Sequence, residues 1–268
     1  MQMATRATHG NDARGPRDPF QAAIQARDRD IPAMVRAALA ANRTQLAFQP
    51  VVKTDGTGQI AFYEGLIRVL DQGGRTLPAA RFMPDVEDTE MGREIDCAAL
   101  RMGLAKLRHN PTLRLSINMS ARSIADGKWR RVLWQGFRAT PGVGERLILE
   151  ISEESAMAMP EVVIRFMAEL QPRGVAFALD DFGAGMTAFR YLKDFFFDMV
   201  KIDRHFIREI QHSPDNQVLA EALIMVAHQF EMTAVAEGVE TAEEAEMIAD
   251  LGVDALQGYL FGVPKPTL

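Results

Sequence analysis

Short apolar runs alternate with longer amphipathic segments from residue 45 to the end of the chain. Apolar runs of this length are typical of buried strands, and apolar residues at helical spacing predict helices. Strands are predicted at 46–52, 60–70, 113–119, 147–152, 175–179, 199–202, 233–236 and 255–260. Helices are predicted at 31–41, 91–108, 129–137, 160–171, 216–230 and 242–251. This alternation indicates parallel strand pairing and the α/β class.

The number of predicted strands favours a closed barrel, because eight strands in roughly 230 residues match the size of a (β/α)8 fold. A doubly wound open sheet is the alternative. No Gly-x-Gly-x-x-Gly follows the first strand, which weakens its dinucleotide-binding version. Residues 53–59 are too few for a crossover helix, so the first two strands should pair antiparallel. We therefore predict an α/β fold, a (β/α)8 TIM-like barrel with an antiparallel first strand.

Composition excludes several classes of protein. A net charge of −6 over 268 residues argues against binding to a nucleic-acid polymer. The single cysteine, Cys97, cannot form an internal disulfide, which fits a cytoplasmic location. No apolar run reaches the length of a membrane span, and no secretory signal is apparent. Residues 1–27 are rich in Arg, Asp, Gly and Pro and are predicted to form a flexible N-terminal tail or linker, with the barrel domain at 28–268.

Two adjacent carboxylates, Asp180 and Asp181, stand at the end of the apolar run 175–179. Ionised groups are rarely buried unless they are paired or bound to a metal. Successive side chains of a regular strand point to opposite faces, so two neighbouring acids cannot both line one face. We therefore expect the chain to leave the strand after residue 179, with Gly183 allowing the turn. The pair predicts a metal site at the C-terminal end of a strand.

Other predicted strands carry a lone polar residue where the apolar run stops or is interrupted. These residues are Glu64, Asn118, Glu150, Lys201, Glu237 and Gln257. Each acid by itself is explained as well by a structural ion pair. The same pattern in seven strands of one chain favours a shared site, because the strand ends of a parallel barrel meet on the face where such barrels place active sites.

The residue types at these positions restrict the chemistry. Carboxylate and amide oxygens suit hard cations such as Mg²⁺, Mn²⁺ or Ca²⁺, whereas the histidines show no zinc-binding spacing. Four crowded carboxylates repel one another unless cations neutralise them. Such a set suits a pair of ions that activate water and clamp a phosphodiester. Lys201 is placed to stabilise developing phosphate charge or to hold the water, and Glu237 to act as general base.

These motifs resemble those of the EAL domain family, bacterial proteins that hydrolyse cyclic di-GMP. The resemblance covers about residues 45–266. In chain order the motifs are Glu64-Gly65-Leu66-Ile67-Arg68, Asn118-Met119-Ser120, Glu150-Ile151-Ser152-Glu153, Asp180-Asp181-Phe182-Gly183, Lys201-Ile202-Asp203, Glu237-Gly238-Val239-Glu240-Thr241 and Gln257-Gly258-Tyr259. The family fold has an antiparallel first strand, as expected here from the loop length.

The resemblance implies a metal centre. Four residues correspond to ligands of a first metal: Glu64, Asn118, Glu150 and Asp180. Asp181 corresponds to a second-metal ligand, with Asp180 bridging the two ions. The implied cofactors are Mg²⁺ or Mn²⁺, two per site, with Ca²⁺ binding and inhibiting.

The remaining catalytic roles are also implied by the resemblance. Lys201 corresponds to the residue that contacts the nucleophilic water, and Glu237 to the proposed general base. Gln257 corresponds to a residue that supports the site and the water. Glu153 corresponds to the glutamate that anchors the loop after Asp181.

The implied activity is a phosphodiesterase that cuts cyclic di-GMP to linear pGpG. Arg68 corresponds to the arginine that contacts the ligand phosphate, and Glu64 and Leu66 are also expected to bind the substrate. Many members form dimers through helices near the second-metal loop, so a homodimer is expected.

Three departures from the family pattern bear on activity. Gly65 replaces the usual alanine of the Glu-Ala-Leu motif. The run 186–189 reads Met-Thr-Ala-Phe where active members usually show a Tyr-Ser-Ser-Leu-like run. Residues 195–197 are three consecutive phenylalanines, which we expect to pack in the core or at a dimer interface.

Two other functions compete with the phosphodiesterase. One is a receptor module that binds cyclic di-GMP and signals through a protein partner with weak or no catalysis, suggested by the altered run 186–189. The other is a different barrel enzyme, because carboxylates with a lysine and Mg²⁺ also suit enolate chemistry.

Overall fold

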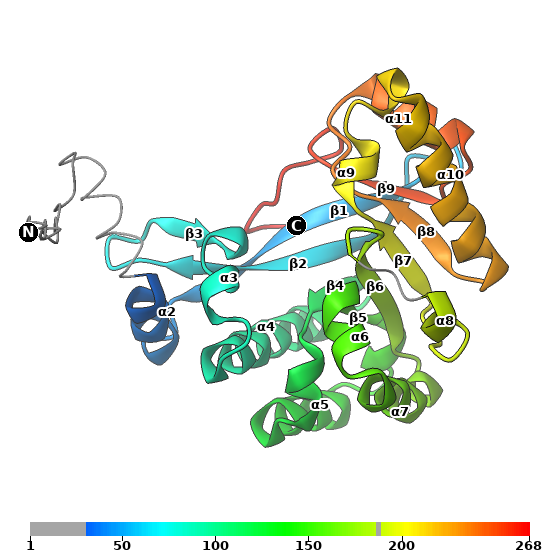
Figure 1. Ribbon diagram of the computed structural model, residues 1–268. Coiled ribbons are helices and arrows are strands. Elements are labelled where there is room, and N and C mark those ends of the chain that lie inside the picture. The colour runs from blue at the N-terminus through cyan, green and yellow to red at the C-terminus, as the bar shows by residue number, and fades with distance from the viewer. Residues whose placement is uncertain (1–30, 186–188) are drawn as a thin grey trace, which may run out of the picture.

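Eight strands close into a barrel in the computed structural model, which describes residues 31–185 and 189–268 (Figure 1). The strands are β1 (Thr44–Lys53), β2 (Ile60–Leu70), β4 (Leu115–Asn118), β5 (Leu147–Ser152), β6 (Ala176–Phe182), β7 (Met199–Ile202), β8 (Thr233–Ala236) and β9 (Ala255–Gln257). The sheet runs β1-β9-β8-β7-β6-β5-β4-β2, and β1 also pairs with β2. The predicted TIM-like barrel is therefore confirmed.

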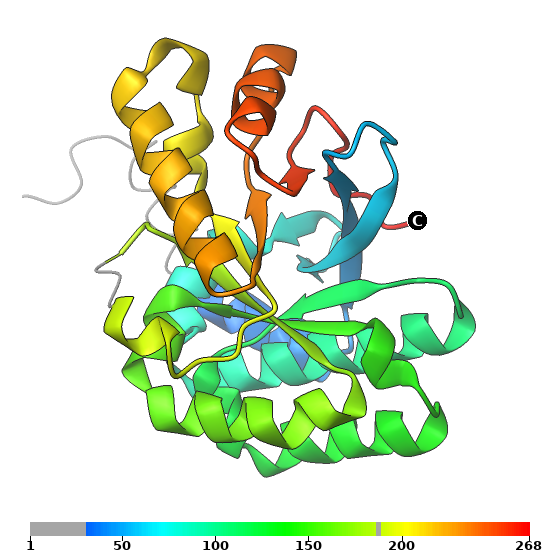
Figure 2. The same cartoon turned by 90° about the vertical axis from the view of Figure 1, so that its right-hand side faces the viewer.

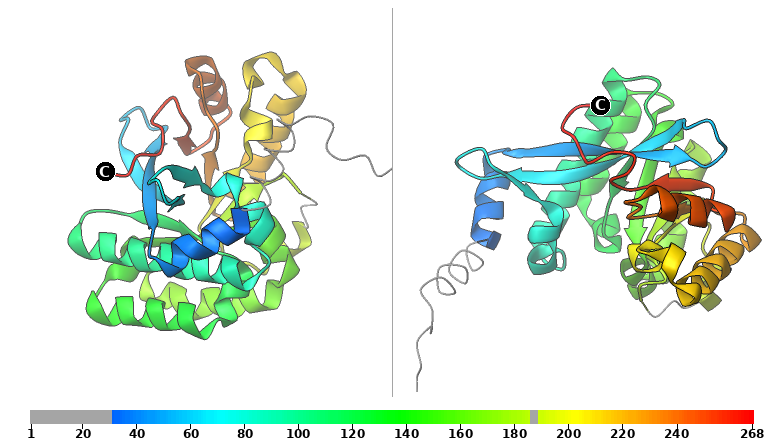
Figure 3. Two further views of the ribbon diagram at one scale, coloured as in Figure 1. Left: turned by 90° about the vertical axis from the view of Figure 1, so that its left-hand side faces the viewer. Right: turned by 90° about the horizontal axis from the view of Figure 1, so that it is seen from above.

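The first strand is antiparallel to both of its neighbours, as its short connection predicted. β1 places Gln49 opposite Glu64 of β2 and Val51 opposite Gln257 of β9. The other six neighbouring pairs of the barrel are parallel. The long β1–β2 hairpin extends beyond the barrel towards α2 (Ile31–Ala40) (Figure 3). The predicted tail, 1–27, lies outside the described residues.

The helices pack around the outside of the sheet, with α4, α5 and α7 on one side and α10 and α11 on another (Figure 2). The long helices are α4 (Glu90–His109), α5 (Gly127–Ala139), α7 (Pro160–Leu170), α10 (Pro214–Gln229) and α11 (Ala242–Asp250). They match the predicted helices closely. Their amphipathic pattern, which is set by packing one face against the strands, is a strong sequence signal.

Several short elements were not predicted from the sequence. They are β3 (Thr76–Pro78), which pairs with β2 outside the barrel, the helices α3 (Met83–Val86), α6 (Glu153–Ala158), α8 (Phe189–Leu192) and α9 (Arg204–Ile207), and 3₁₀ turns at Ala79–Arg81, Ala121–Ala125, Val143–Arg146, Gln171–Arg173 and Ile210–His212. Each contains too few residues to show a period.

Two predicted strand ends were wrong by three residues. β9 ends at Gln257 rather than at residue 260. β6 does not end at residue 179 but continues to Phe182, with a register shift between Leu179 and Phe182. Asp181 has a φ of 55°, in the left-handed region. An irregularity of this kind re-aims side chains without ending the strand, so the paired carboxylates lie on a distorted strand rather than beyond it.

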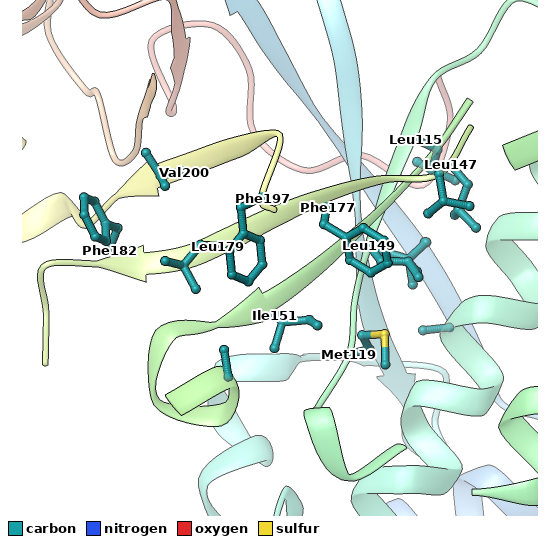
Figure 4. Packing of buried hydrophobic residues seen from close by; sticks show 14 of the residues in the cluster. Leu115, Met119, Leu147, Leu149, Ile151, Phe177, Leu179, Phe182, Phe197 and Val200 are labelled. Atoms are coloured by element: carbon teal, nitrogen blue, oxygen red, sulfur yellow. The ribbon is translucent and has the colours of Figure 1, made fainter. Parts of the chain in front are cut away.

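The outer core fills the space between the strands and the helices. Figure 4 shows Leu149 and Ile151 of β5 beside Phe177 and Leu179 of β6, all on the side of the sheet that faces the helices. Phe177 is fully buried, and its ring meets that of Phe166 at 5.7 Å in an edge-on arrangement. None of the helices in the described ranges has the length and apolarity that a membrane span requires.

The barrel interior contains a separate apolar layer. Its buried members are Val51, Phe62, Ile148, Ala178, Met199, Val235 and Ala255. Five of them stand two positions before Glu64, Glu150, Asp180, Lys201 and Glu237, and Ala255 stands two before Gln257. Because side chains alternate along a strand, the residue two positions on also faces the interior. The apolar layer thus forms the floor beneath a polar layer at the C-terminal strand ends.

The glycine in the Glu64-Gly65-Leu66 motif has a local packing cause. A Cβ on Gly65 would lie 2.8 Å from Cδ1 of Ile117 and 3.2 Å from the carbonyl oxygen of Ser116. Ile117 is almost fully buried, and its Cδ1 would also lie 2.7 Å from a Cβ on Gly103. Ile117 therefore occupies the space that an alanine side chain would need.

Restoring the alanine should destabilise this chain. We expect Gly65→Ala to lower the free energy of unfolding by about 1–3 kcal/mol through overpacking. Adding Ile117→Val, which removes the crowded Cδ1, should recover part of the loss. Denaturant unfolding of the two single variants and the double variant measures this coupling. Gly127→Ala is the control, because nothing lies within 4 Å of a Cβ there. Equal stability of wild type and Gly65→Ala would contradict the packing explanation.

Candidate active site

The polar residues predicted at seven strand ends converge above the apolar floor. Lys201 of β7 lies at the centre and is 1% exposed. Its Nζ lies 3.1 Å from Glu64 Oε2, 3.0 Å from Glu150 Oε2, 3.3 Å from Asp180 Oδ1 and 2.5 Å from Glu237 Oε1. One buried ammonium group thus contacts carboxylates from four other strands or strand ends.

Glu64 is held by two amides as well as by Lys201. Asn118 at the end of β4 donates to Glu64 Oε1 at 2.6 Å, and Gln257 at the end of β9 donates to Glu64 Oε2 at 2.5 Å. The Gln257 amide also donates to Gln49 Oε1 of β1 at 3.3 Å. These hydrogen bonds link Glu64 of β2 to the ends of β4 and β9 and, through Gln257, to β1. The sequence predicted these strands but not the contacts between their side chains.

Electrostatics favours an additional cation at this cluster. Burial and the neighbouring Glu64 raise the pKa of Glu150 to about 8, and burial also raises the pKa of Asp180 and of Glu237. Burial would raise the pKa of Glu64 too, but Lys201 and the amide donors outweigh it and lower that pKa. The single ammonium of Lys201 therefore does not neutralise all the carboxylates around it.

A second group of oxygens lies at the mouth of the site. Ligand atoms of Asp180, Asp181 and Glu237 all lie within 4.8 Å of one another. Burial and then the neighbouring Asp180 raise the pKa of Asp181 to about 6. Buried Oε1 atoms of Glu150 and Gln257 have no hydrogen-bond partner among the described residues. Oxygen donors that are crowded and incompletely paired are the ligands that Mg²⁺ and Mn²⁺ prefer, so the residues present fit these ions.

The other predicted site residues have separate places. Glu153, the first residue of α6, accepts a hydrogen bond from the backbone N–H of Gly183 at 3.1 Å, which ties it to the turn after Asp181. Arg68 stands on β2 four residues after Glu64, and its Nη1 donates to the carbonyl of Ile67 at 3.0 Å. It does not touch the carboxylate cluster.

A cavity of about 480 Å³ opens beside the cluster. Glu64, Leu66, Asn118, Asp180 and Asp181 all line it. It is large enough for a small organic ligand to enter next to the carboxylates. Leu66, which was expected to bind substrate, supplies apolar surface to the wall on the side of β2.

The family model of the EAL domain matches residues 33–264 of this chain. The chain belongs to the EAL domain family. Two relatives illustrate the match. The bifunctional diguanylate cyclase/cyclic di-GMP phosphodiesterase MucR of Pseudomonas aeruginosa is 29% identical over 237 residues, which is 87% of this chain and 34% of MucR. The cyclic di-GMP phosphodiesterase PdeF of Escherichia coli is 30% identical over 236 residues, 86% of this chain and 31% of PdeF.

Solved structures agree with this assignment. The PaMucR phosphodiesterase in complex with c-di-GMP superposes with a TM-score of 0.80 at 28% identity, covering 89% of this chain and 98% of that chain. The FimX EAL domain of Pseudomonas aeruginosa bound to c-di-GMP also gives 0.80, at 25% identity, covering 89% and 97%. The chain spans about a third of the length of the two curated relatives that it matches.

The structure describes some of the residues at which the chain departs from the EAL pattern. Met186, Thr187 and Ala188 lie outside the described residues. Phe195 and Phe197 are buried with ring centroids 5.3 Å apart, as the core-packing interpretation predicted. Phe196 is 61% exposed, and its carbonyl accepts a hydrogen bond from Gln171 at 2.6 Å.

Sequence reasoning missed Asp96, a buried carboxylate of α4 that lines the cavity. Its Oδ2 accepts hydrogen bonds from the backbone N–H of Ser120 at 2.9 Å and from the hydroxyl of Ser123 at 2.6 Å. Asp96 thereby holds the turn that follows Asn118. The available signal was a lone acid within the apolar stretch of a predicted helix, the same signal that marked Glu64 on its strand.

Removing the central ammonium should destabilise the EAL domain in a way that depends on pH. Loss of one partner from a buried ion pair costs about 3–5 kcal/mol, so Lys201→Met should lower Tm by roughly 10 °C near pH 8. The raised pKa of Glu150, about 8, means that this acid takes up a proton as the pH falls. The deficit should therefore shrink at pH 5.5. Added Mn²⁺ should also reduce it, because an ion that binds only the folded state stabilises that state.

Thermal unfolding at both pH values, with and without Mn²⁺, checks this prediction. Lys128→Met is the matched control, since the Lys128 side chain is largely exposed and lies 3.9 Å from Glu94 at its nearest carboxylate contact. A Lys201→Met deficit that neither pH nor Mn²⁺ changes would show that the carboxylate cluster is not its cause.

Proposed function

We propose that this EAL domain is a cyclic di-GMP phosphodiesterase that produces linear pGpG by means of a metal-activated water. The observation that carries the proposal is the complete polar layer at seven strand ends, with no expected acid, amide or lysine missing. The likeness to structures that contain c-di-GMP supports the choice of substrate. A receptor without catalysis would not need the whole set.

The metal ligands follow from the two groups of oxygens. Glu64, Asn118, Glu150 and Asp180 would hold one ion, and Asp181 with Asp180 a second, with Mg²⁺ or Mn²⁺ as the active species and Ca²⁺ as an inhibitor. Bound ions of this kind lower the pKa of a coordinated water and neutralise charge on the phosphate. A bound cation would also lower the raised pKa values of Glu150 and Asp180 and so favour their ionised forms.

The other side chains have roles that their contacts suit. Lys201 is anchored by carboxylates on several sides, so its ammonium is fixed where it can orient the attacking water and stabilise phosphate charge. Glu237 stands beside both Lys201 and the Asp180–Asp181 pair, where a carboxylate can accept the proton of that water. Arg68, on the same face of β2 as Glu64, supplies a cation for the substrate phosphate, and Leu66 contacts the ligand within the cavity.

Hydrolysis assays test the proposal directly. Cyclic di-GMP should be converted to pGpG with Mg²⁺ or Mn²⁺, and Ca²⁺ should suppress the reaction. Glu237→Gln removes the proposed base and should lower kcat by about 10²–10⁴-fold, while ligand affinity changes little. Chromatography of the products and calorimetric titration of the ligand measure the two quantities. A Glu237→Gln variant with near-normal turnover would remove Glu237 as the base.

A receptor is the second candidate function. The observation that favours it is that the run 186–189, which begins five residues after Asp181, departs from the active pattern at Met186 and Ala188. Tight binding of cyclic di-GMP by folded protein, with no product under any metal condition, would support the receptor and contradict the phosphodiesterase proposal. Such a receptor would signal through a protein partner.

We also propose that the domain forms a homodimer through α10. Val218 and Met225 stand seven positions apart on one face of this helix and are 66% and 62% exposed. Leu219 beside them is also exposed. The opposite face of α10 packs against the turn that follows Asp181, because Leu223 Cδ1 would lie 3.0 Å from a Cβ on Gly183. A partner that covers the exposed face of α10 would therefore be separated from the turn that follows Asp181 only by this helix.

A charge on this face should prevent association. We expect Met225→Glu to convert a dimer to a monomer at micromolar concentration, because an unpaired buried charge is costly in an interface. Sedimentation velocity measures the change. Ile60→Glu is the control, since Ile60 is a similarly exposed apolar side chain on β2. Wild type that sediments as a monomer at all concentrations, or a Met225→Glu dimer, would contradict this interface.

A further inference from the structure

Glu244 on the first turn of α11 is a buried carboxylate that touches none of the site residues. It is 3% exposed. Its Oε1 accepts a hydrogen bond from the backbone N–H of Glu209 at 2.8 Å. Its Oε2 accepts from the backbone N–H of Glu240 at 2.8 Å and of Thr241 at 3.1 Å. One side chain therefore binds two separate segments, one after β7 and one after β8.

A cap on helix α11 explains only part of this arrangement. Thr241 and Glu244 form a reciprocal capping box, in which the backbone N–H of Glu244 donates to Thr241 Oγ1 at 3.2 Å. The bond to Glu209 lies outside that motif. Glu209 has a φ of 54°, a left-handed conformation that is uncommon for a residue with a side chain. The three amides hold the pKa of Glu244 below its ordinary value against the effect of burial, so the clamp is charged.

The segment that Glu244 holds is the one that carries Glu237. Residues 237–241 contain no regular secondary structure. Their backbone is fixed by neighbours instead: Glu237 N–H donates to the carbonyl of Ile202 at 3.1 Å, and Val239 N–H donates to that of Gln257 at 3.1 Å. Gly238, with a φ of 70°, packs so closely that a Cβ there would lie 2.6 Å from Cβ of Arg204.

These contacts join the ends of three strands, β7, β8 and β9. Those ends carry Lys201, Glu237 and Gln257, and Glu237 Oε1 lies 2.5 Å from Lys201 Nζ. An irregular segment keeps a side chain at such a distance only when its backbone is restrained on each side. The hydrogen bonds to the carbonyls of Ile202 and Gln257 fix the segment on the side of the barrel strands. The hydrogen bonds to Glu244 fix it on the side of α11.

We propose that Glu244 is a positioning residue that fixes the 237–241 segment and thereby the place of Glu237 beside Lys201 and the Asp180–Asp181 pair. Its effect on turnover depends on the phosphodiesterase function proposed above; its effect on the segment does not. Productive geometry requires such supporting contacts because small displacements of a catalytic group cost large factors in rate.

Glu244→Gln is the informative variant, because it keeps the shape of the side chain but replaces one accepting oxygen by an amide that cannot accept. Glu243→Gln is the matched control: it removes the same charge from the same helix turn, at an exposed neighbour. Two measurements apply: amide hydrogen exchange resolved at Glu209, Glu240 and Thr241, and steady-state kinetics with cyclic di-GMP.

In Glu244→Gln the remaining amide oxygen can keep only one of the two sets of bonds, so exchange should accelerate about tenfold or more either at Glu209 or at Glu240 and Thr241, while amides within the strands keep their protection and Tm changes little. The value of kcat should fall about tenfold with KM within about twofold, a loss of about 1.4 kcal/mol from the transition state. Glu243→Gln should change neither. Faster exchange with unchanged kcat would reduce Glu244 to a helix cap, and unchanged exchange would overturn the clamp.

The two proposals fail in different ways. Wild-type protein that does not hydrolyse cyclic di-GMP contradicts the phosphodiesterase function but leaves the exchange measurement decisive for Glu244. In that case Mn²⁺ affinity, measured by calorimetry without substrate, replaces kcat. Glu237 is not one of the proposed metal ligands, but its carboxylate lies within 4.8 Å of the ligand atoms of Asp180 and Asp181. Because loss of such a supporting group weakens a metal site, Glu244→Gln should weaken Mn²⁺ binding about tenfold. Unchanged Mn²⁺ affinity would then overturn the positioning role.

Discussion

A single buried ammonium among carboxylates is the interaction on which the site depends. Lys201 Nζ contacts Glu64, Glu150, Asp180 and Glu237, which come from four other places in the barrel. Burying any one of these charges alone would be prohibitive, so each is tolerated only because the others are present. The strands that carry them must therefore keep their register, and the apolar floor below excludes water from that side.

The supporting contacts follow a common plan. Behind the polar layer, three buried carboxylates hold backbone amides of the connecting turns: Asp96 the turn after Asn118, Glu153 the turn after Asp181, and Glu244 the segment after Glu237. Turns at the C-terminal ends of strands are irregular and cannot satisfy their own N–H groups, so an acceptor from a neighbouring helix stabilises them. The same helices that cover the barrel thus determine where the site residues point.

Much of the fold was predictable because it depends on pattern. Alternating apolar runs and amphipathic segments, together with the short link between residues 53 and 59, led to a barrel with an antiparallel first strand. Short elements such as β3 and α9 show no period and were missed. The strand carrying Asp180 and Asp181 was predicted to end too early, because alternation assumes regular geometry and the register shift after Leu179 breaks it.

The sequence alone predicted which polar side chains gather at the strand ends, since an acid, amide or lysine at the end of an apolar run is conspicuous when seven strands repeat it. Only the tertiary structure decided how they are used. It showed that Lys201 is the common partner, that Glu237 stands beside the Asp180–Asp181 pair, that Arg68 does not touch the cluster, and that Asp96 and Glu244 hold the turns. Those relations depend on contacts between residues distant along the chain, and such contacts are set by strand register and helix packing rather than by local pattern.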